Sequence, residues 1–311
     1  MDCQKKPALW LSYKYLGPRT LRTIEYLSPT ALFDWRANRE EFYRKRLADN
    51  KLPRMPQTDA MAVGSAFDAY VKAELGKGDF EQLFCAQVEE QNRAQALVDG
   101  ERCLSEYKKC GAFSDLQIII NDAQFELTVQ ESVAHQDLGP VPLLGKPDAF
   151  FKNANGDHVI LDWKVNGYYS KRGAYINKGY VVERPSGRRH KEAHVINVHG
   201  VDVNISGNME TFNREWATQT AMYSWLLGAE VGSEILVCID QLVWRDNQMT
   251  VGEHRAYVGR EFQLSLFSEL AELWSIISSG WIFRDMPEEE SRARQRSLDQ
   301  TCNDPALLAC L

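Results

Sequence analysis

Apolar residues at helical spacing run through the first third of the chain. Between residues 28 and 51 they follow a Ser-Pro helix-start signal, and Arg and Lys side chains occupy the opposite face. The same period continues through 61–75 and 80–110, whereas two prolines interrupt it between 52 and 59. We therefore predict a basic amphipathic helix, a linker and further helices.

The pattern changes to short β-rich runs after residue 115. The pair Asn155-Gly156, a strong hairpin signal, separates two of these runs. Residues 166–207 show no clear periodicity and are expected to form a long loop or a small subdomain, whose length favours a functional role. We predict strands at 118–120, 125–129, 141–151, 158–165, 234–244 and 248–258, and helices at 210–227 and 260–279.

This order of elements predicts an α/β fold, with a central mixed β-sheet flanked by helices and an N-terminal helical region. We expect a mainly helical part over residues 1–115 and a core over 116–285. The core carries a basic loop insertion at about 166–207. A charged tail over 286–311 is expected to have a mobile end.

Composition agrees with a globular protein. Of 311 residues, 44% are hydrophobic and 25% are charged. No apolar run approaches the roughly 18 residues that cross a bilayer, and the N-terminus lacks the sustained apolar stretch of a secretion signal. Seven cysteines are scattered without a CxxC pair, which is typical of reduced thiols. We expect a cytoplasmic protein without a membrane partner.

Two acidic residues and a lysine stand on neighbouring predicted strands. Asp148 lies near the end of one strand, and Asp162 and Lys164 lie on the next. An antiparallel hairpin can bring the carboxylates together, and residues two apart point to the same face. Carboxylates hold Mg²⁺, which lowers the pKa of a bound water, and an ammonium can orient that water for attack on a phosphodiester. A D-x-K tripeptide by itself is also typical of a solvated ion pair.

Three motifs follow one another along the chain: G-x-x-D at residues 145–148, D/E-x-K at 162–164, and Q-x-x-x-Y at 219–223. In this order they resemble the RecB-like branch of the PD-(D/E)XK nucleases, which includes lambda-exonuclease-type enzymes. The resemblance implies a restriction-endonuclease-like core. The cysteine set of the family's iron-sulfur branch is absent, so no iron-sulfur cluster is expected.

The resemblance also implies a role for each motif residue. Asp148, Asp162 and the main-chain carbonyl of Trp163 would bind one or two Mg²⁺ or Mn²⁺ ions. Lys164 would position the attacking water. The residues that would support the site are Gln219 and Tyr223.

The helix predicted over 61–75 resembles the G-x-x-x-H helix of the same family, with one departure. Asp68 stands where histidine is usual. A metal ligand is implied at this position, and the alternative is a carboxylate packed near a helix start. Glu126 and Glu131 are candidate auxiliary acids, which solvent-face carboxylates explain equally well.

A basic, tyrosine-rich segment follows the proposed catalytic lysine. Residues 164–191 hold eight basic side chains and one acid, so eight minus one gives +7 inside a chain of −7. Cations can contact phosphates and tyrosines can stack on unpaired bases, which favours DNA binding over a merely solvated loop. His190, His194 and His199 lack a fourth ligand and are expected to be surface or DNA-facing rather than zinc ligands. The predicted DNA-binding residues are Tyr168, Tyr169, Lys171, Arg172, Lys178, Arg188 and Arg189.

Together these features predict a Mg²⁺-dependent DNase, by resemblance an exonuclease in recombination, repair or phage DNA processing. It would act in a bacterial cell or a phage-infected host, with DNA and a recombination or replication protein as partners. Two alternatives stay open: a catalytically weak DNA-binding accessory protein with the same fold, and a restriction-type endonuclease. The missing histidine favours the first, and the Q-x-x-x-Y motif argues against the second.

Overall fold

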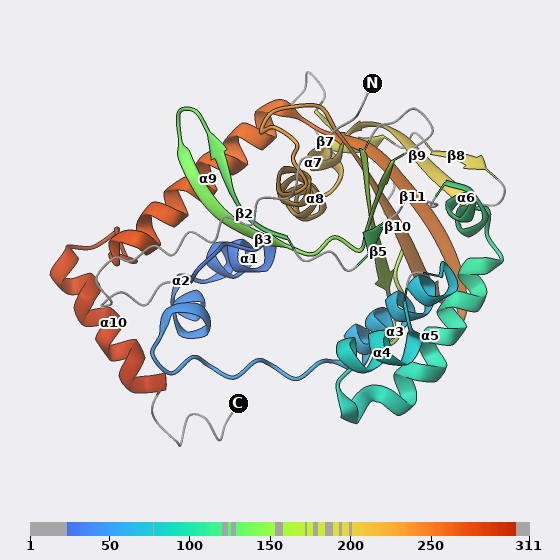
Figure 1. The fold of residues 1–311 in the computed structure, drawn as a ribbon, viewed down its shortest axis with the longest axis horizontal. Coiled ribbons are helices and arrows are strands. Elements are labelled where there is room, and N and C mark those ends of the chain that lie inside the picture. The colour runs from blue at the N-terminus through green and yellow to red at the C-terminus, as the bar shows by residue number, and fades with distance from the viewer. Residues whose placement is uncertain are drawn as a thin grey trace, which may run out of the picture.

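The computed structural model describes residues 24–76, 78–119, 124–125, 129–152, 158–171, 173–176, 180–183, 189–192, 195–198 and 201–302. Within this part of the chain, a mixed seven-stranded sheet in the order β1-β4-β5-β10-β11-β9-β8 is flanked by helices (Figure 1), so the α/β prediction is confirmed. Its strands are β1 (Gln124–Phe125), β4 (Ala149–Lys152), β5 (His158–Asn166), β8 (Val195–Val198), β9 (Val201–Asn208), β10 (Ile235–Arg245) and β11 (Gln248–Val258). Two further hairpins are β2 (Val129–His135) with β3 (Gly139–Gly145), and β6 (Tyr180–Glu183) with β7 (Arg189–Glu192).

The helices form two groups on either side of β5 and β10 (Figure 1). One group consists of α3 (Asp59–Glu74), α4 (Phe80–Gln87), α5 (Arg93–Lys108) and α6 (Gly111–Ile119). The other consists of α1 (Pro29–Ala37), α2 (Arg39–Phe42), α7 (Met209–Phe212), α8 (Arg214–Leu226), α9 (Arg260–Ser279) and α10 (Glu288–Cys302). A π-helical turn (Tyr43–Leu47) follows α2, and a 3₁₀ turn (Glu90–Asn92) precedes α5. Among the helices of the described ranges, none is long and apolar enough to cross a membrane.

The central strands separate two hydrophobic cores, because alternate side chains of a strand point to opposite faces. One core packs Ile239 of β10 with buried residues of α8 and α9, including Phe267. The other packs Trp163 of β5 and Phe67 of α3 around Tyr107 of α5. Both faces of the strand that carries the D-x-K motif are therefore covered.

Strand pairing places the D-x-K motif in the middle of the sheet. β5 runs antiparallel to β4 and parallel to β10, with Lys164 beside Gln241. β10 and β11 form an antiparallel hairpin, and its turn residues Asp246 and Asn247 have φ angles of 52° and 60°. Two positive φ angles match the type I′ turn that suits the twist of a hairpin. The predicted turn at 155–156 lies outside the described residues.

Two predicted elements are wrong near the N-terminal end. The single helix over 28–51 is divided, because the side chain of Asn38 caps a new helix by accepting hydrogen bonds from the main-chain N–H groups two and three residues later (2.9 and 3.2 Å). The strand predicted at 118–120 falls in α6 as far as the structure describes it. Phe113 and Leu116, three residues apart, bury one side of this helix, so its apolar run belongs to a helical face.

Further along, the strand predicted over 141–151 divides at residues 146–148, so that β3 and β4 belong to different sheets. Residues 166–207 contribute strands β6 to β9 within the described ranges. The charged tail begins with α10. The Tyr43 hydroxyl lies 3.2 Å from both carboxylate oxygens of Asp299 in this helix and donates a hydrogen bond to them. The predictions for β5, β10, β11 and α9 are confirmed, and a short break after Phe212 divides the helix over 210–227 into α7 and α8.

Gly100 lets α5 pack closely against α3, because a Cβ there would lie 2.6 Å from Ala66 Cβ and 3.0 Å from the Ala66 carbonyl carbon. We predict that Gly100→Ala lowers the free energy of unfolding by about 1–3 kcal/mol, because overpacking outweighs the gain in helix propensity. Gly64→Ala in α3 is the matched control, since its Cβ would meet nothing within 4 Å, and it should stabilise by up to about 1 kcal/mol. Urea unfolding measures both, and equal stabilisation by the two substitutions would contradict this packing.

Candidate active site

The start of β4 and the middle of β5 bring Asp148 beside Asp162. Asp148 directly precedes β4, which pairs with β5 at Ala149 and Leu161. The Trp163 N–H donates a hydrogen bond of 3.0 Å to Asp148 Oδ2 and so fixes this carboxylate next to the D-x-K strand. The structure therefore brings the first two motifs together.

Gln219 on α8 connects three polar groups at this place. Its Oε1 accepts a hydrogen bond of 3.1 Å from Lys164 Nζ, and its Nε2 donates to Asp162 Oδ1 at 2.9 Å and to the Tyr223 hydroxyl at 3.1 Å. Lys164 Nζ also lies 2.5 Å from Asp162 Oδ2. Gln219 and Tyr223 are one helical turn apart, so α8 presents both on the side that meets β5. The D-x-K and Q-x-x-x-Y residues thus form one connected polar cluster.

The glycine of the G-x-x-D motif is explained by packing. A Cβ on Gly145 would lie 2.6 Å from Tyr223 Cδ1 and 2.7 Å from Leu226 Cδ1. The missing side chain lets α8 approach the end of β3 closely enough to carry Tyr223 to the cluster. The first and third motifs are therefore linked by direct contact.

Burial and the neighbouring charges shift the pKa values of Asp162 and Lys164. The pKa of Asp162 is raised to about 7, because burial and the Asp148 carboxylate together raise it by more than the Lys164 ammonium lowers it. Burial lowers the pKa of Lys164, but the charges of Asp162 and Asp148 outweigh burial and bring it above its usual value. A further cation would stabilise the ionised carboxylates.

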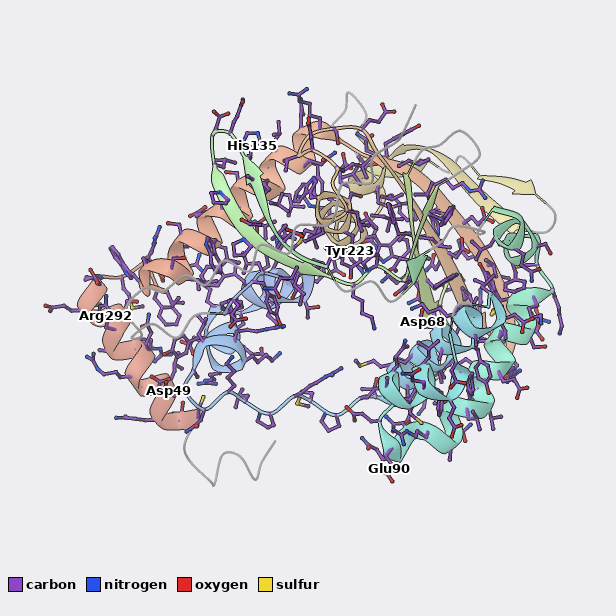
Figure 2. The ribbon with its side chains drawn as sticks, viewed as in Figure 1. Asp49, Asp68, Glu90, His135, Tyr223 and Arg292 are labelled. Carbon is purple, nitrogen blue, oxygen red and sulfur yellow. The ribbon has the colours of Figure 1, made fainter. Side chains whose placement is uncertain are left out.

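Asp68 stands on α3 and Tyr223 on α8 (Figure 2), and the charge of Asp148 acts on the pKa of Asp68. The pKa of Asp68 is raised to about 6, because burial and then the charge of Asp148 raise it by more than Lys72 lowers it. Lys72 Nζ donates a hydrogen bond of 2.6 Å to Asp68 Oδ2, and its side chain is only 1% exposed. The sequence analysis missed Lys72, although the D-x-x-x-K spacing on a predicted helix is a signal for such a pair.

Two buried carboxylate oxygens differ in their surroundings: Asp68 Oδ1 accepts no hydrogen bond, whereas Asp162 Oδ2 lies 2.5 Å from the Lys164 ammonium without a well-aligned hydrogen bond. Buried acceptors in this state are rare, and carboxylate oxygens are the ligands that Mg²⁺ prefers. In the part of the chain that the structure describes, no group of three or more His, Cys, Asp and Glu side chains is arranged to hold a metal ion. A divalent cation between Asp148 and Asp162 would therefore also need main-chain, water or substrate oxygens.

A second buried polar group lies on the other face of β5, and the sequence analysis missed it. The Tyr107 hydroxyl donates to Asp240 and accepts a hydrogen bond of 3.3 Å from Trp163 Nε1. Glu253 stands directly opposite Asp240 in the β10–β11 register. Burial, followed by the charge of Glu253, raises the pKa of Asp240 to about 7. An acid inside a strand whose residues are mostly apolar is the sequence signal for such a group.

The tyrosines after β5 have two kinds of surroundings. The hydroxyls of Tyr168 and Tyr169 both donate to Asp99 of α5, so these side chains join the loop to the helical side. Tyr169 remains 44% exposed. Tyr175 is 64% exposed, with the guanidinium carbon of Arg245 4.3 Å from the centre of its ring.

The other predicted residues are only partly within the described structure. Lys171 is exposed, as is Glu131 on β2. The main chain of Arg189 and His190 belongs to β7. The residues that lie outside the described ranges are Glu126, Arg172, Lys178, Arg188, His194 and His199.

Comparisons with known proteins give remote structural likenesses. No family model and no curated protein matches the chain. A solved structure described as a "putative exonuclease" from Eubacterium rectale is 12% identical with a TM-score of 0.47, over 82% of this chain and 81% of that chain. Another, described as SSO0001, is 12% identical with a TM-score of 0.27, over 80% of this chain and 86% of that chain. Neither likeness assigns a family or an activity.

A buried histidine of β11 was also missed by the sequence analysis. His254 is 2% exposed and packs against the rings of Phe212 (4.6 Å between centroids) and Trp216 (5.4 Å). Burial lowers its pKa to about 3, so it is neutral in the folded protein at ordinary pH.

We predict that His254→Gln changes how stability depends on pH. The pKa of His254 is about 3 in the folded protein and 6.5 when unperturbed, so between these values the unfolded chain binds an extra proton and the free energy of unfolding decreases as the pH is lowered. From pH 6.5 to about pH 4.5 the wild type should lose about 2–3 kcal/mol of unfolding free energy relative to the variant. Urea unfolding at both pH values measures the difference, and parallel pH profiles would contradict it.

Proposed function

We propose that this chain is a metal-dependent DNA nuclease of the PD-(D/E)XK type. The observation that supports the proposal is the single cluster in which Asp148, Asp162 and Lys164 meet, with Gln219 and Tyr223 bonded to it. Two carboxylates and an ammonium suit a divalent cation and a phosphodiester. All three motifs of the family resemblance contribute to this one cluster.

In the proposed reaction, Asp148, Asp162 and the main-chain carbonyl of Trp163 would hold Mg²⁺ or Mn²⁺. The ion would supply a bound water of lowered pKa and offset charge on the phosphate. Lys164 would orient the water and stabilise the negative charge that develops on the phosphate oxygens. The Gln219 amide bonds to both Lys164 and Asp162, so it keeps the ammonium and the carboxylate at a fixed separation.

Asp68 is proposed as a further carboxylate for the ion or for a water bound to it. Its Oδ1 accepts no hydrogen bond, and the charge of Asp148 acts directly on its pKa. The Asp68–Lys72 pair in place of the usual histidine also motivates the second candidate, an accessory protein that binds DNA and cleaves it weakly.

Lys164→Ala should lower the rate of DNA degradation in Mg²⁺ by at least about a hundredfold, because it removes the group that orients water and stabilises charge. Release of labelled nucleotides from linear DNA measures this rate. Lys109→Ala, at an exposed lysine after α5, is the matched control and should keep the wild-type rate. Equal, negligible degradation by wild type and Lys164→Ala, with DNA binding intact, would support the accessory protein instead.

The same assay on covalently closed plasmid separates the two nuclease types. We propose an exonuclease, which would degrade linear DNA and leave the closed circle intact. A restriction-type endonuclease would cut the circle into discrete fragments. The proposed setting is the cell interior, in recombination, repair or phage DNA processing.

Tyr175→Ala should weaken binding of a fluorescently labelled single strand by about tenfold or more, because an exposed ring backed by a guanidinium can stack on an unpaired base. Fluorescence anisotropy in EDTA measures binding without cleavage. Tyr257→Ala is the control. Tyr257 is also exposed, but it lies about 30 Å along β11 from Gln248, the residue that pairs with Arg245. Equal affinities for wild type and both variants would contradict a DNA contact at Tyr175.

A further inference from the structure

Asn166 ends the polar row that begins with Asp162 and Lys164. Residues two apart on a strand share a face, so Asn166 lies on the same face of β5 as the cluster and about 6.6 Å beyond Lys164. Its side chain is half-buried and takes no part in the hydrogen bonds of the cluster. It therefore borders the place where a phosphate would bind.

Gln241 of β10 holds the Asn166 side chain in one orientation. It stands directly beside Lys164 in the parallel β5–β10 register, and it is 3% exposed. Its Nε2 donates a hydrogen bond of 3.0 Å to Asn166 Oδ1. The carbonyl side of the Asn166 amide is thereby turned toward the sheet.

His254 fixes the direction of this chain of hydrogen bonds. Its Nε2 lies 3.1 Å from Gln241 Oε1. An amide oxygen can only accept, so Nε2 carries the ring proton and donates it. A neutral imidazole with its proton on Nε2 satisfies this contact, and the surrounding rings of Phe212 and Trp216 keep the imidazole in place.

The direction of these hydrogen bonds decides which atoms Asn166 presents to a ligand. Each donor in the series faces an acceptor, from His254 to Gln241 and from Gln241 to Asn166 Oδ1. Among the described residues, Asn166 makes no other hydrogen bond, so its Nδ2 keeps two N–H donors. A neutral double donor beside an ammonium is complementary to the oxygens of a phosphodiester.

We propose that Asn166 Nδ2 binds a non-bridging oxygen of the phosphate next to the one that is cleaved, and that Gln241 and His254 are positioning residues for this amide. The proposal rests on the proposed function, since it requires DNA to pass Lys164. It adds a contact that carries no sequence information and sets the position of the strand.

Asn166→Asp tests the proposal with little change in shape. The aspartate still offers an oxygen to Gln241, but it replaces the outward donor by a negatively charged acceptor. The Kd of a short labelled DNA strand, measured by anisotropy in EDTA, should rise by about tenfold or more. Asn50→Asp makes the same charge change at an exposed residue that takes no part in the proposed DNA contacts, and it should leave the Kd unchanged. Equal Kd values for wild type and Asn166→Asp would overturn the proposal.

A scan with neutral methylphosphonate linkages separates contact from general charge repulsion. Wild type should lose affinity when the linkage bound by Asn166 is neutralised, and Asn166→Leu should show no further loss at that linkage. Equal losses at every linkage in both proteins would overturn the contact.

The positioning role has its own pair of variants. In Gln241→Glu, the carboxylate can only accept hydrogen bonds, so the Asn166 amide should turn its Nδ2 toward residue 241 and its oxygen outward. The Kd should then rise as it does for Asn166→Asp. His254→Gln keeps a donor at the same place and should retain the wild-type Kd. Thermal unfolding of each variant verifies that it is folded, and a wild-type Kd for Gln241→Glu would overturn the positioning role.

Cleavage of linear DNA by the wild type in Mg²⁺ is recorded in the same series. A wild type that binds and cleaves DNA, with Asn166→Asp unaffected, overturns the Asn166 assignment alone. A wild type that neither binds nor cleaves DNA overturns the assignment together with the proposed function.

Discussion

The alternation of side chains along β5 is the constraint on which the candidate site depends. Asp162 and Lys164 point toward α8, while Trp163 between them is buried against Phe67 on the other face. A shift of one residue in the pairing of β5 would exchange an indole for two charged groups. Burial on both faces therefore specifies the register of the strand, and the register specifies which groups meet Asp148.

Neutral hydrogen-bonding groups organise the acidic cluster as much as charges do. The main-chain N–H of Trp163 holds Asp148, and the Gln219 amide holds Asp162 and Lys164 at the same time. Groups fixed in this way need little rearrangement when a charge develops nearby, which is the physical basis of electrostatic preorganisation. The glycine at 145 belongs to the same arrangement, because its missing side chain admits α8.

Much of the central sheet could be predicted from the sequence, because β5, β10 and β11 each have a length and composition typical of strands. The spacing of Asp162 and Lys164 also predicted their shared face. The helical character of residues 111–119 could not be predicted with the same confidence, since a short apolar run suits a buried helix as well as a strand. The Tyr107–Asp240 contact joins residues 133 positions apart, and no local pattern contains that information.

The β10–β11 hairpin carries a buried acid on one face and a buried imidazole on the other, and the two have opposite preferences for hydrogen ions. Asp240 keeps its proton up to about pH 7 in the folded protein and would release it on unfolding, because its unperturbed pKa is 3.8. His254 stays unprotonated down to about pH 3 in the folded protein and would take up a proton on unfolding. Between about pH 4 and 6.5, opening the hairpin therefore transfers a hydrogen ion from carboxyl to imidazole with almost no net exchange with the solvent. Mild acidification leaves the combined contribution of these two groups to stability nearly constant.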